Sequence, residues 1–467
     1  MLAVLTTWLW NEFRWPPWAS TSCVALLLAL LLLHAADRVV LSRTKAAEAK
    51  RKGAEGAAAS PDKCAHDAAA FERFRWQYLT VYFLVMFADW LQGTHMYSLY
   101  QSYGVNVGAL FLTGFLSSAV FGSFIGPIVD RYGRRSACLV YCALEIIINL
   151  LENVPDMTVL LIGRVLGGIS TSLLFSAFES WMVTEHRARG FAEELIPKTF
   201  AIASEGNGIL AVLAGFAAQA AADAFGEIGP FRLAVVVTTF AGAFVCSWTE
   251  NYGLTTRNDN DSKKTSSSTE EEEKAQLDAD AYALGLCYSL FDGAMFVFVF
   301  LWYPTLEAVV PDGILPSGLV FSSFMLCIAI GGKLFDQISR TTLSGELFAS
   351  LLCAVSVVAL LIPTATDSHM WILGAFFIFE LAIGAFAPCC GTLRTRYFPA
   401  SGLSTTLGLF RLPTNILVVV GTGGASHFTT DQLFSGCSIV LVLSTLCAVK
   451  LYWSSLAAAS NKKAKTN

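Results

Sequence analysis

The stretch Gly126-Pro127-Ile128-Val129-Asp130-Arg131-Tyr132-Gly133-Arg134-Arg135 is a short charged segment between two long apolar runs. Comparable runs of about 20 residues recur along most of the 467-residue chain. In a bilayer every backbone polar group must be satisfied internally, so runs of this length cross the hydrocarbon as helices. The charged stretch is therefore predicted to be a loop between two spans of an all-α membrane protein.

The composition agrees with a membrane protein. Hydrophobic residues make up 55% of the chain and charged residues 14%, whereas a soluble domain carries about 25% charged residues. The twelve cysteines lie mostly in apolar runs and show no metal-site or secreted-framework spacing, which indicates packing residues. No catalytic constellation and no nucleotide motif is present, so we expect no enzyme, no cofactor, no metal and no nucleic-acid partner.

Thirteen segments are long enough to cross a bilayer, some of them only with flanking residues snorkelling. One basic stretch separates the first segment from the other twelve. The predicted spans are 19–36, 76–99, 107–128, 136–151, 157–183, 199–222, 229–248, 281–303, 316–335, 346–363, 370–393, 402–424 and 432–453.

The positions of Lys and Arg predict the orientation. With the Asp130 loop in the cytoplasm, 26 of the 31 basic residues fall on the cytoplasmic side and two outside. Three remain within spans, namely Arg164, Lys333 and Arg411. The first span is followed, not preceded, by a basic cluster, which favours a retained anchor with its N-terminus outside. Trp8, Trp10, Trp15 and Trp18 fit an interfacial belt on that outer side.

A polar segment divides the twelve core spans into six plus six. It contains Ser266-Ser267-Ser268 and Glu270-Glu271-Glu272-Glu273, a composition that cannot bury a core. The predicted parts are an anchor with its basic linker (1–75), a first six-helix bundle (76–254), a disordered acidic linker (255–280), a second six-helix bundle (281–453) and a cytoplasmic tail (454–467).

An internal repeat supports the same division. Gly126 and Asp130 end the second core span, and Gly332 and Asp336, followed by Arg340, end the eighth. The second copy lacks the Gly-Arg-Arg of the first. Repeated halves around a midplane site are a transporter architecture.

The segment 126–135 resembles the loop signature of the major facilitator superfamily, Gly-x-x-x-Asp-Arg-x-Gly-Arg-Arg/Lys. The stretch 163–168 resembles the Arg-x-x-x-Gly element of the same superfamily. Glycine lets helix ends approach, and an aspartate can face a helix N-terminus. The resemblance implies a major facilitator fold with two six-helix bundles, here with one extra N-terminal transmembrane helix. It also implies a gating role for Gly126, Asp130, Arg131, Gly133, Arg134, Arg135 and Asp336.

Longer stretches look like one branch of that superfamily, the molybdate-anion transporters. They are 88–92, 163–170, 174–181, 250–252, 296–302, 321–325 and 410–413, within a resemblance that covers about 71–453. The resemblance implies molybdate uptake across a cell membrane by alternating access. The alternatives are transport of another anion, transport of an organic solute, and a receptor that senses a solute without translocating it.

Charged residues inside spans are costly and usually face a cavity. The superfamily resemblance implies that core helices 1, 4, 7 and 10 line the path, and each carries charge. The intramembrane charges are Asp89, Glu145, Arg164, Glu179, Glu205, Asp292, Glu380 and Arg411.

A doubly charged oxyanion needs fixed donors, and arginine supplies a rigid fork that stays ionised. Arg164 and Arg411 are therefore candidates for clamping the anion, with Asn415 as a weaker one. The alternative is that each arginine pairs permanently with a buried acid, Glu145 or Glu380. The six acids then have two readings, namely proton coupling, in which Asp89, Asp292 or Glu380 carries a proton during transport, and charge balance for the arginines.

Overall fold

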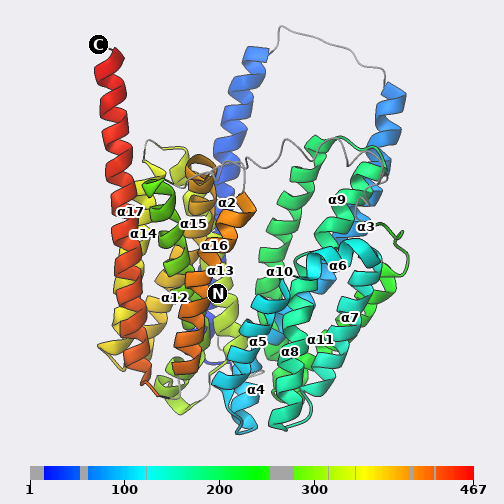
Figure 1. The fold of residues 1–467 in the computed structure, drawn as a ribbon, viewed down its shortest axis with the longest axis vertical. Coiled ribbons are helices and arrows are strands. Elements are labelled where there is room, and N and C mark those ends of the chain that lie inside the picture. The colour runs from blue at the N-terminus through cyan, green and yellow to red at the C-terminus, as the bar shows by residue number, and fades with distance from the viewer. Residues whose placement is uncertain are drawn as a thin grey trace, which may run out of the picture.

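The computed structural model describes residues 15–52, 61–122, 124–252, 278–313, 315–341, 343–398, 403–424 and 427–466. Within these ranges the regular structure is helical, with short connections between helices, and the helices form two bundles that stand side by side (Figure 1). The expected acidic linker, apart from 278–280, lies outside the described residues, as do Trp8 and Trp10.

The N-terminal bundle comprises α3 to α11. Its helices are α3 (Pro61–Gly93), α4 (Met96–Ser102), α5 (Val107–Gly122), α6 (Ile125–Tyr132), α7 (Arg134–Leu151), α8 (Met157–Leu174), α9 (Ala177–Ala188), α10 (Ile196–Phe225) and α11 (Gly229–Val245). The start of α8 is fixed by Asp156, whose carboxylate accepts hydrogen bonds from the amides of Thr158 and Val159 at 2.9 and 3.1 Å. Helix α5 packs on α8, and α3 packs on α10 and α11.

The C-terminal bundle comprises α12 (Ala279–Val309), α13 (Ser317–Ser339), α14 (Gly345–Leu361), α15 (His369–Tyr397), α16 (Leu403–Gly424) and α17 (Thr430–Thr466). Its core is aromatic, because Phe291 stacks on Phe386 with 3.8 Å between ring centroids and Phe298 meets Phe379 edge to face at 4.9 Å. Helices α13 and α15 touch backbone to backbone at Gly384, where a Cβ would lie 2.1 Å from the carbonyl oxygen of Ile328.

The extra helix α2 (Pro17–Lys52) packs on α13. Ahead of its first turn, Trp15 donates a hydrogen bond from Nε1 to Asp223 of α10 at 2.8 Å. Ring contact with Phe216 of α10 and burial against Leu319 of α13 complete this anchor. The helix therefore begins at the seam where the two bundles meet.

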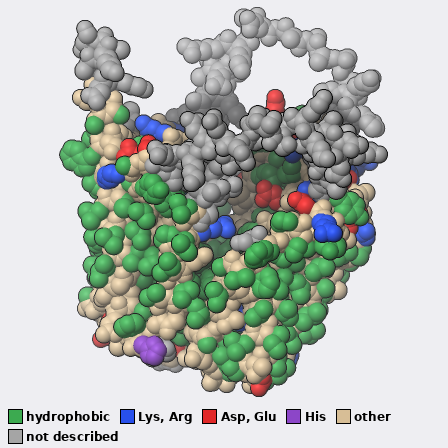
Figure 2. Space-filling view, viewed as in Figure 1, with side chains coloured by type: hydrophobic (Ala, Val, Ile, Leu, Met, Phe, Trp, Pro, Cys, Tyr) green, Lys and Arg blue, Asp and Glu red, His purple; other side chains and the backbone are tan. Residues whose placement is uncertain are grey.

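Each predicted span corresponds to a helix or a broken pair of helices. By length and composition, eight helices of the described part could cross a membrane, or nine if α5 and α6, bent by 57°, form one span. Hydrophobic side chains cover most of the face in Figure 2, with charged ones gathered toward its upper end. This upper end, which carries the 130–135 loop, is named the basic end. The chain is thus a multi-pass membrane protein, and the full set of thirteen crossings stays a prediction.

Several helices differ in their ends from the predicted spans. The span 76–99 ends at Gly93 and a short helix α4 follows, while 157–183 is broken between Leu174 and Ala177. The tail expected after residue 453 continues α17 as helix to Thr466. Hydropathy marks where a chain leaves the apolar layer, whereas a helix continues wherever its backbone bonds can be extended.

Candidate functional site

The two bundles meet in the half of the molecule opposite the basic end. Gln101 donates from Nε2 to Glu307 Oε2 at 2.8 Å across the seam, and Tyr97 lies 5.1 Å from Tyr303 between ring centroids. Phe111 of α5 meets Phe300 of α12 at 5.4 Å. These contacts close that half with aromatic side chains drawn from both bundles.

A charged cluster lies in the C-terminal bundle, where α12, α15 and α16 converge. The guanidinium carbon of Arg394 lies 4.1 Å from the ring centroid of Tyr288, within the range of a cation–π contact. Tyr288 lies one turn from Asp292 on α12 and interacts with its carboxyl group, and Arg394 and Arg411 lie near enough to act on that group electrostatically. The cluster therefore places two arginines and a phenol near one acid, with no ion pair within 4.0 Å from Asp292 to either arginine in the described part of the chain.

The position of Arg411 is set by the packing of its neighbours. The ring of Phe410 fills the space over Gly285, where a Cβ would lie 2.2 Å from it. The Ser289 hydroxyl donates to the Phe410 carbonyl, and the Thr414 hydroxyl donates to the Ser289 carbonyl at 3.0 Å. These contacts hold α16 against α12. The side chain of Arg411 is exposed, and Asn415, one turn further on, is exposed as well.

Arg164 is engaged within the N-terminal bundle. Its Nη2 lies 2.5 Å from Glu152 Oε1, and the Tyr100 hydroxyl donates to the same oxygen at 2.9 Å. The Glu152 side chain is only 1% exposed. The predicted partners Glu145 and Glu380 are wrong for this arginine, because Glu152 at the end of α7 packs next to α8. The structure pairs Arg164 with an acid and leaves Arg411 exposed within electrostatic reach of Asp292, and it does not join the two arginines in one cluster.

Glu145 is held by neutral donors. Its carboxylate accepts hydrogen bonds from Gln92 Nε2 at 2.8 Å, from the Ser170 hydroxyl at 2.6 Å and from Asn149 at 3.4 Å. Asp89 lies near enough to interact with it electrostatically. Among the described residues no ion pair reaches either acid.

Glu380 is 4% exposed and lies within the aromatic core of the C-terminal bundle. Its carboxyl group faces Cys327 of α13 closely enough to interact with it electrostatically. Glu205 of α10 is exposed instead. Neither acid makes a hydrogen bond or an ion pair with another described side chain.

The signature loop forms one network with the end of α11. Asp130 of α6 and Arg134 of α7 pair at 2.6 Å across the corner between these helices, and the Arg134 amide donates to the Asn251 carbonyl at 2.9 Å. Glu250 caps α7, accepting from the amides of Arg135 and Ser136 at 2.8 and 3.0 Å. The acid at this helix N-terminus is therefore Glu250, where Asp130 was expected.

Gly133 is required at the corner before α7. Its φ of 106° lies in the left-handed region, and a Cβ there would lie 2.7 Å from the Glu250 carboxylate. Gly126 has open space around it in this conformation. Asp130 and Arg131 are exposed. The degenerate second copy keeps one element, since Asp336 pairs with Arg340 at 2.6 Å with the same spacing of four residues.

Sequence reasoning missed Arg394, Tyr288 and Glu152. Arg394 falls one residue beyond the predicted span 370–393, and the structure places it in the last turn of α15. The spacing of Tyr288 and Asp292, four residues apart on one helix, is the signal that could have paired them.

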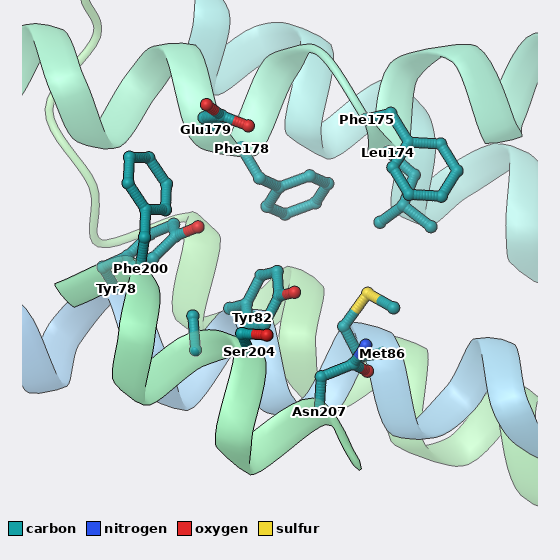
Figure 3. Close-up of a pocket in the computed structure, with 11 residues that line it drawn as sticks. Tyr78, Tyr82, Met86, Leu174, Phe175, Phe178, Glu179, Phe200, Ser204 and Asn207 are labelled. Carbon is teal, nitrogen blue, oxygen red and sulfur yellow. The ribbon is translucent and has the colours of Figure 1, made fainter. Parts of the chain in front are cut away.

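A second feature is a cavity of about 370 Å³ in the N-terminal bundle. It is lined by residues of α3, α9 and α10 together with the end of α8 (Figure 3). Phe178 and Tyr82 face one another across it, with Glu179 beside Phe178. Two helical bundles with charged and aromatic groups between their helices are typical of a transporter of small solutes.

Comparison with known proteins agrees. Residues 52–374 match the profile of a family described as sugar transporters with twelve transmembrane spans. The chain is 33% identical over 405 residues to the molybdate-anion transporter of Xenopus tropicalis, covering 82% of this chain and 86% of the relative. It is 30% identical over 426 residues to that of Danio rerio, covering 82% and 88%. The chain therefore belongs to the molybdate-anion transporter family of the major facilitator superfamily.

Solved structures show the same fold. A peptide transporter in complex with sulfate superposes with a TM-score of 0.64 at 16% identity, covering 83% of this chain and 94% of the other. A nucleoside transporter, NupG, superposes with a TM-score of 0.58 at 12% identity, covering 81% and 99%. Relatives and neighbours are all named as transporters, in agreement with the expectation that the protein is not an enzyme.

Proposed function

We propose that the protein takes up molybdate, or a closely similar tetrahedral oxyanion, across the cell membrane by alternating access. The observation that carries this proposal is the convergence of Arg394 and Arg411 on Asp292 and Tyr288. The names of the relatives support the substrate.

The cluster has the chemistry that a dianion requires. Two guanidinium groups from different helices provide several fixed N–H donors, and the Tyr288 hydroxyl adds one more. With no anion bound, Asp292 balances part of their charge. When the oxyanion arrives it competes with Asp292 for the arginines, and protonation of Asp292 removes the repulsion between carboxylate and substrate. Proton-coupled uptake follows from this exchange.

The remaining sequence candidates receive supporting roles. Arg164 stabilises the N-terminal bundle through Glu152, and Asn415 extends the polar face of α16 beyond Arg411. Asp89, Glu145 and Glu380, which have no ion pair in the described part of the chain, are the further candidates for proton binding. Glu205 is exposed on α10 and has a role in charge balance at most.

The mechanism rests on the arrangement of the contacts between the bundles. The aromatic contacts around Tyr97 and Tyr303 close the end opposite the basic end, so this conformation corresponds to one extreme of the cycle. The other extreme requires these contacts to part and the basic ends to approach. The network of Asp130, Arg134 and Glu250 stays within the N-terminal bundle and sets the shape of its gating loop.

The test is uptake of labelled molybdate into proteoliposomes, with sulfate, phosphate and tungstate as competitors. Arg411→Ala and Arg394→Ala should each weaken binding by about 1.5–3 kcal/mol, the loss of a charged hydrogen bond. That is roughly a ten- to hundred-fold loss of affinity. Lysine should rescue only partly, because it keeps the charge without the fork. Wild-type uptake in both alanine variants would exclude the cluster as the anion site, and binding without accumulation would indicate a receptor.

A second candidate is carriage of an organic solute. The matched family profile is described for sugar transporters, and five of the eleven residues that line the cavity of the N-terminal bundle are aromatic. Inhibition of molybdate uptake by neutral sugars, and not by tungstate or sulfate, would favour this alternative.

A further inference from the structure

The cavity in the N-terminal bundle has a composition that does not suit an oxyanion. Tyr78, Tyr82, Phe178 and Phe200 contribute aromatic rings, and Glu179 is its one acidic residue. The described residues that line it include no Lys, Arg or His. A dianion placed in this cavity would meet a carboxylate and no compensating cation. The cavity lining therefore differs in chemistry from the arginine cluster of the C-terminal bundle.

The carboxylate of Glu179 is unengaged in the described structure. It is exposed on the first turn of α9, and it makes no hydrogen bond or ion pair with another described residue. It lies close enough to Tyr78 and Tyr82 to interact with both electrostatically. A negative group beside several aromatic faces attracts a cation twice, through its own charge and through the ring quadrupoles.

The rings are held in place by their neighbours. Tyr78 and Tyr82 stack with 5.7 Å between centroids, one turn apart on α3. Phe178 lies edge to face with Tyr141 at 5.3 Å and with Trp248 at 6.3 Å. Because these rings are already held by their neighbours, their side chains lose little conformational freedom when a ligand binds.

The cavity also has an open side and a polar edge. Phe175, at the break between α8 and α9, is 70% exposed. Asn207 is oriented by Trp90, whose Nε1 donates to its side-chain oxygen at 2.9 Å. A volume of about 370 Å³ is at the lower end of the range for small-molecule sites, which suits a compact organic ligand.

We propose that this cavity is a second binding site, which takes a small organic cation of the quaternary ammonium type between Tyr82 and Phe178, with Glu179 as its counter-ion (Figure 3). The site lies wholly within the N-terminal bundle, and the oxyanion cluster lies wholly within the C-terminal bundle. This inference therefore goes beyond the proposed oxyanion function and does not depend on it.

The experiment measures equilibrium binding of labelled choline to the purified full-length protein in molybdate-free buffer. Choline carries the quaternary ammonium group, and 3,3-dimethyl-1-butanol has the same shape without the charge. Choline should bind saturably, and the neutral isostere should compete at least about ten-fold more weakly, because it lacks the cation–π and ionic terms. If the isostere competes as well as choline, or if choline shows no saturable binding, the wild-type protein alone refutes the proposal.

Variants then locate the site. Glu179→Gln and Tyr82→Leu should each weaken choline binding by about ten-fold or more. Glu194→Gln is the matched control, since Glu194 is an exposed acid at the same end of the molecule outside the cavity. Gel filtration shows which variants are folded. Wild-type choline binding in a folded Glu179→Gln protein, or an equal loss in Glu194→Gln, refutes the assignment, whereas loss of molybdate uptake alone bears only on the oxyanion site.

Discussion

Replacement of Arg164 by alanine distinguishes a structural arginine from a substrate-binding one. The Arg164 guanidinium contacts Glu152 at 2.5 Å, and the Glu152 side chain is 1% exposed. After Arg164→Ala, Glu152 keeps the Tyr100 hydroxyl at 2.9 Å, while its Oε2 has no partner in the described structure even before the change. A buried carboxylate stripped of its cation costs about 3–5 kcal/mol of stability.

The assay combines three readouts on the same samples: the folded yield by gel filtration, the melting temperature in detergent, and molybdate affinity per folded protein. Arg164→Ala should lower yield and melting temperature and leave the affinity of the folded fraction near wild type. Adding Glu152→Gln should recover much of the loss, because the amide can still accept from Tyr100 but carries no charge. Arg187→Ala is the control, since Arg187 and Glu193 form a pair with both side chains 61% exposed and should contribute little.

Two results would refute this reasoning. One is an Arg164→Ala protein with wild-type stability, which would mean that Glu152 is solvated or protonated without its partner. The other is normal stability with a large loss of molybdate affinity, which would return Arg164 to the substrate site.

Three further predictions follow from the gating loop and the topology. Gly133→Ala should destabilise the protein by about 1–3 kcal/mol, because it strains a left-handed φ and displaces the capping carboxylate, while Gly167→Ala, in a helix with open space around it, should not lower the melting temperature. Asp130→Asn should slow transport more than it weakens binding, and normal turnover with lost affinity would contradict the gating role. On intact cells an impermeant reagent should label a tag at Met1 and spare one at Asn467, and labelling of both would rule out an odd number of spans.

The sequence alone determined the fold class and the division into two halves. Apolar runs must become helices in a bilayer, because the backbone has no other partner there, and hydropathy is local along the chain. The loop signature around Asp130 and the acidic stretch 270–273 then located the repeat and the boundary. Even the helix break at Phe175 leaves that reading intact, because it changes a boundary within one span and not the order of spans.

Only the tertiary structure decided which charges meet. Arg164 could be paired on sequence grounds with Glu145 or Glu380, yet its partner is Glu152, which the boundary of a predicted span had left outside the membrane. Arg394 lies just beyond a predicted span and reaches Tyr288 from the last turn of α15. Both contacts depend on the rotation and register of one helix relative to another. Contacts such as the ring of Phe410 over Gly285 set those quantities, and no hydropathy pattern records them.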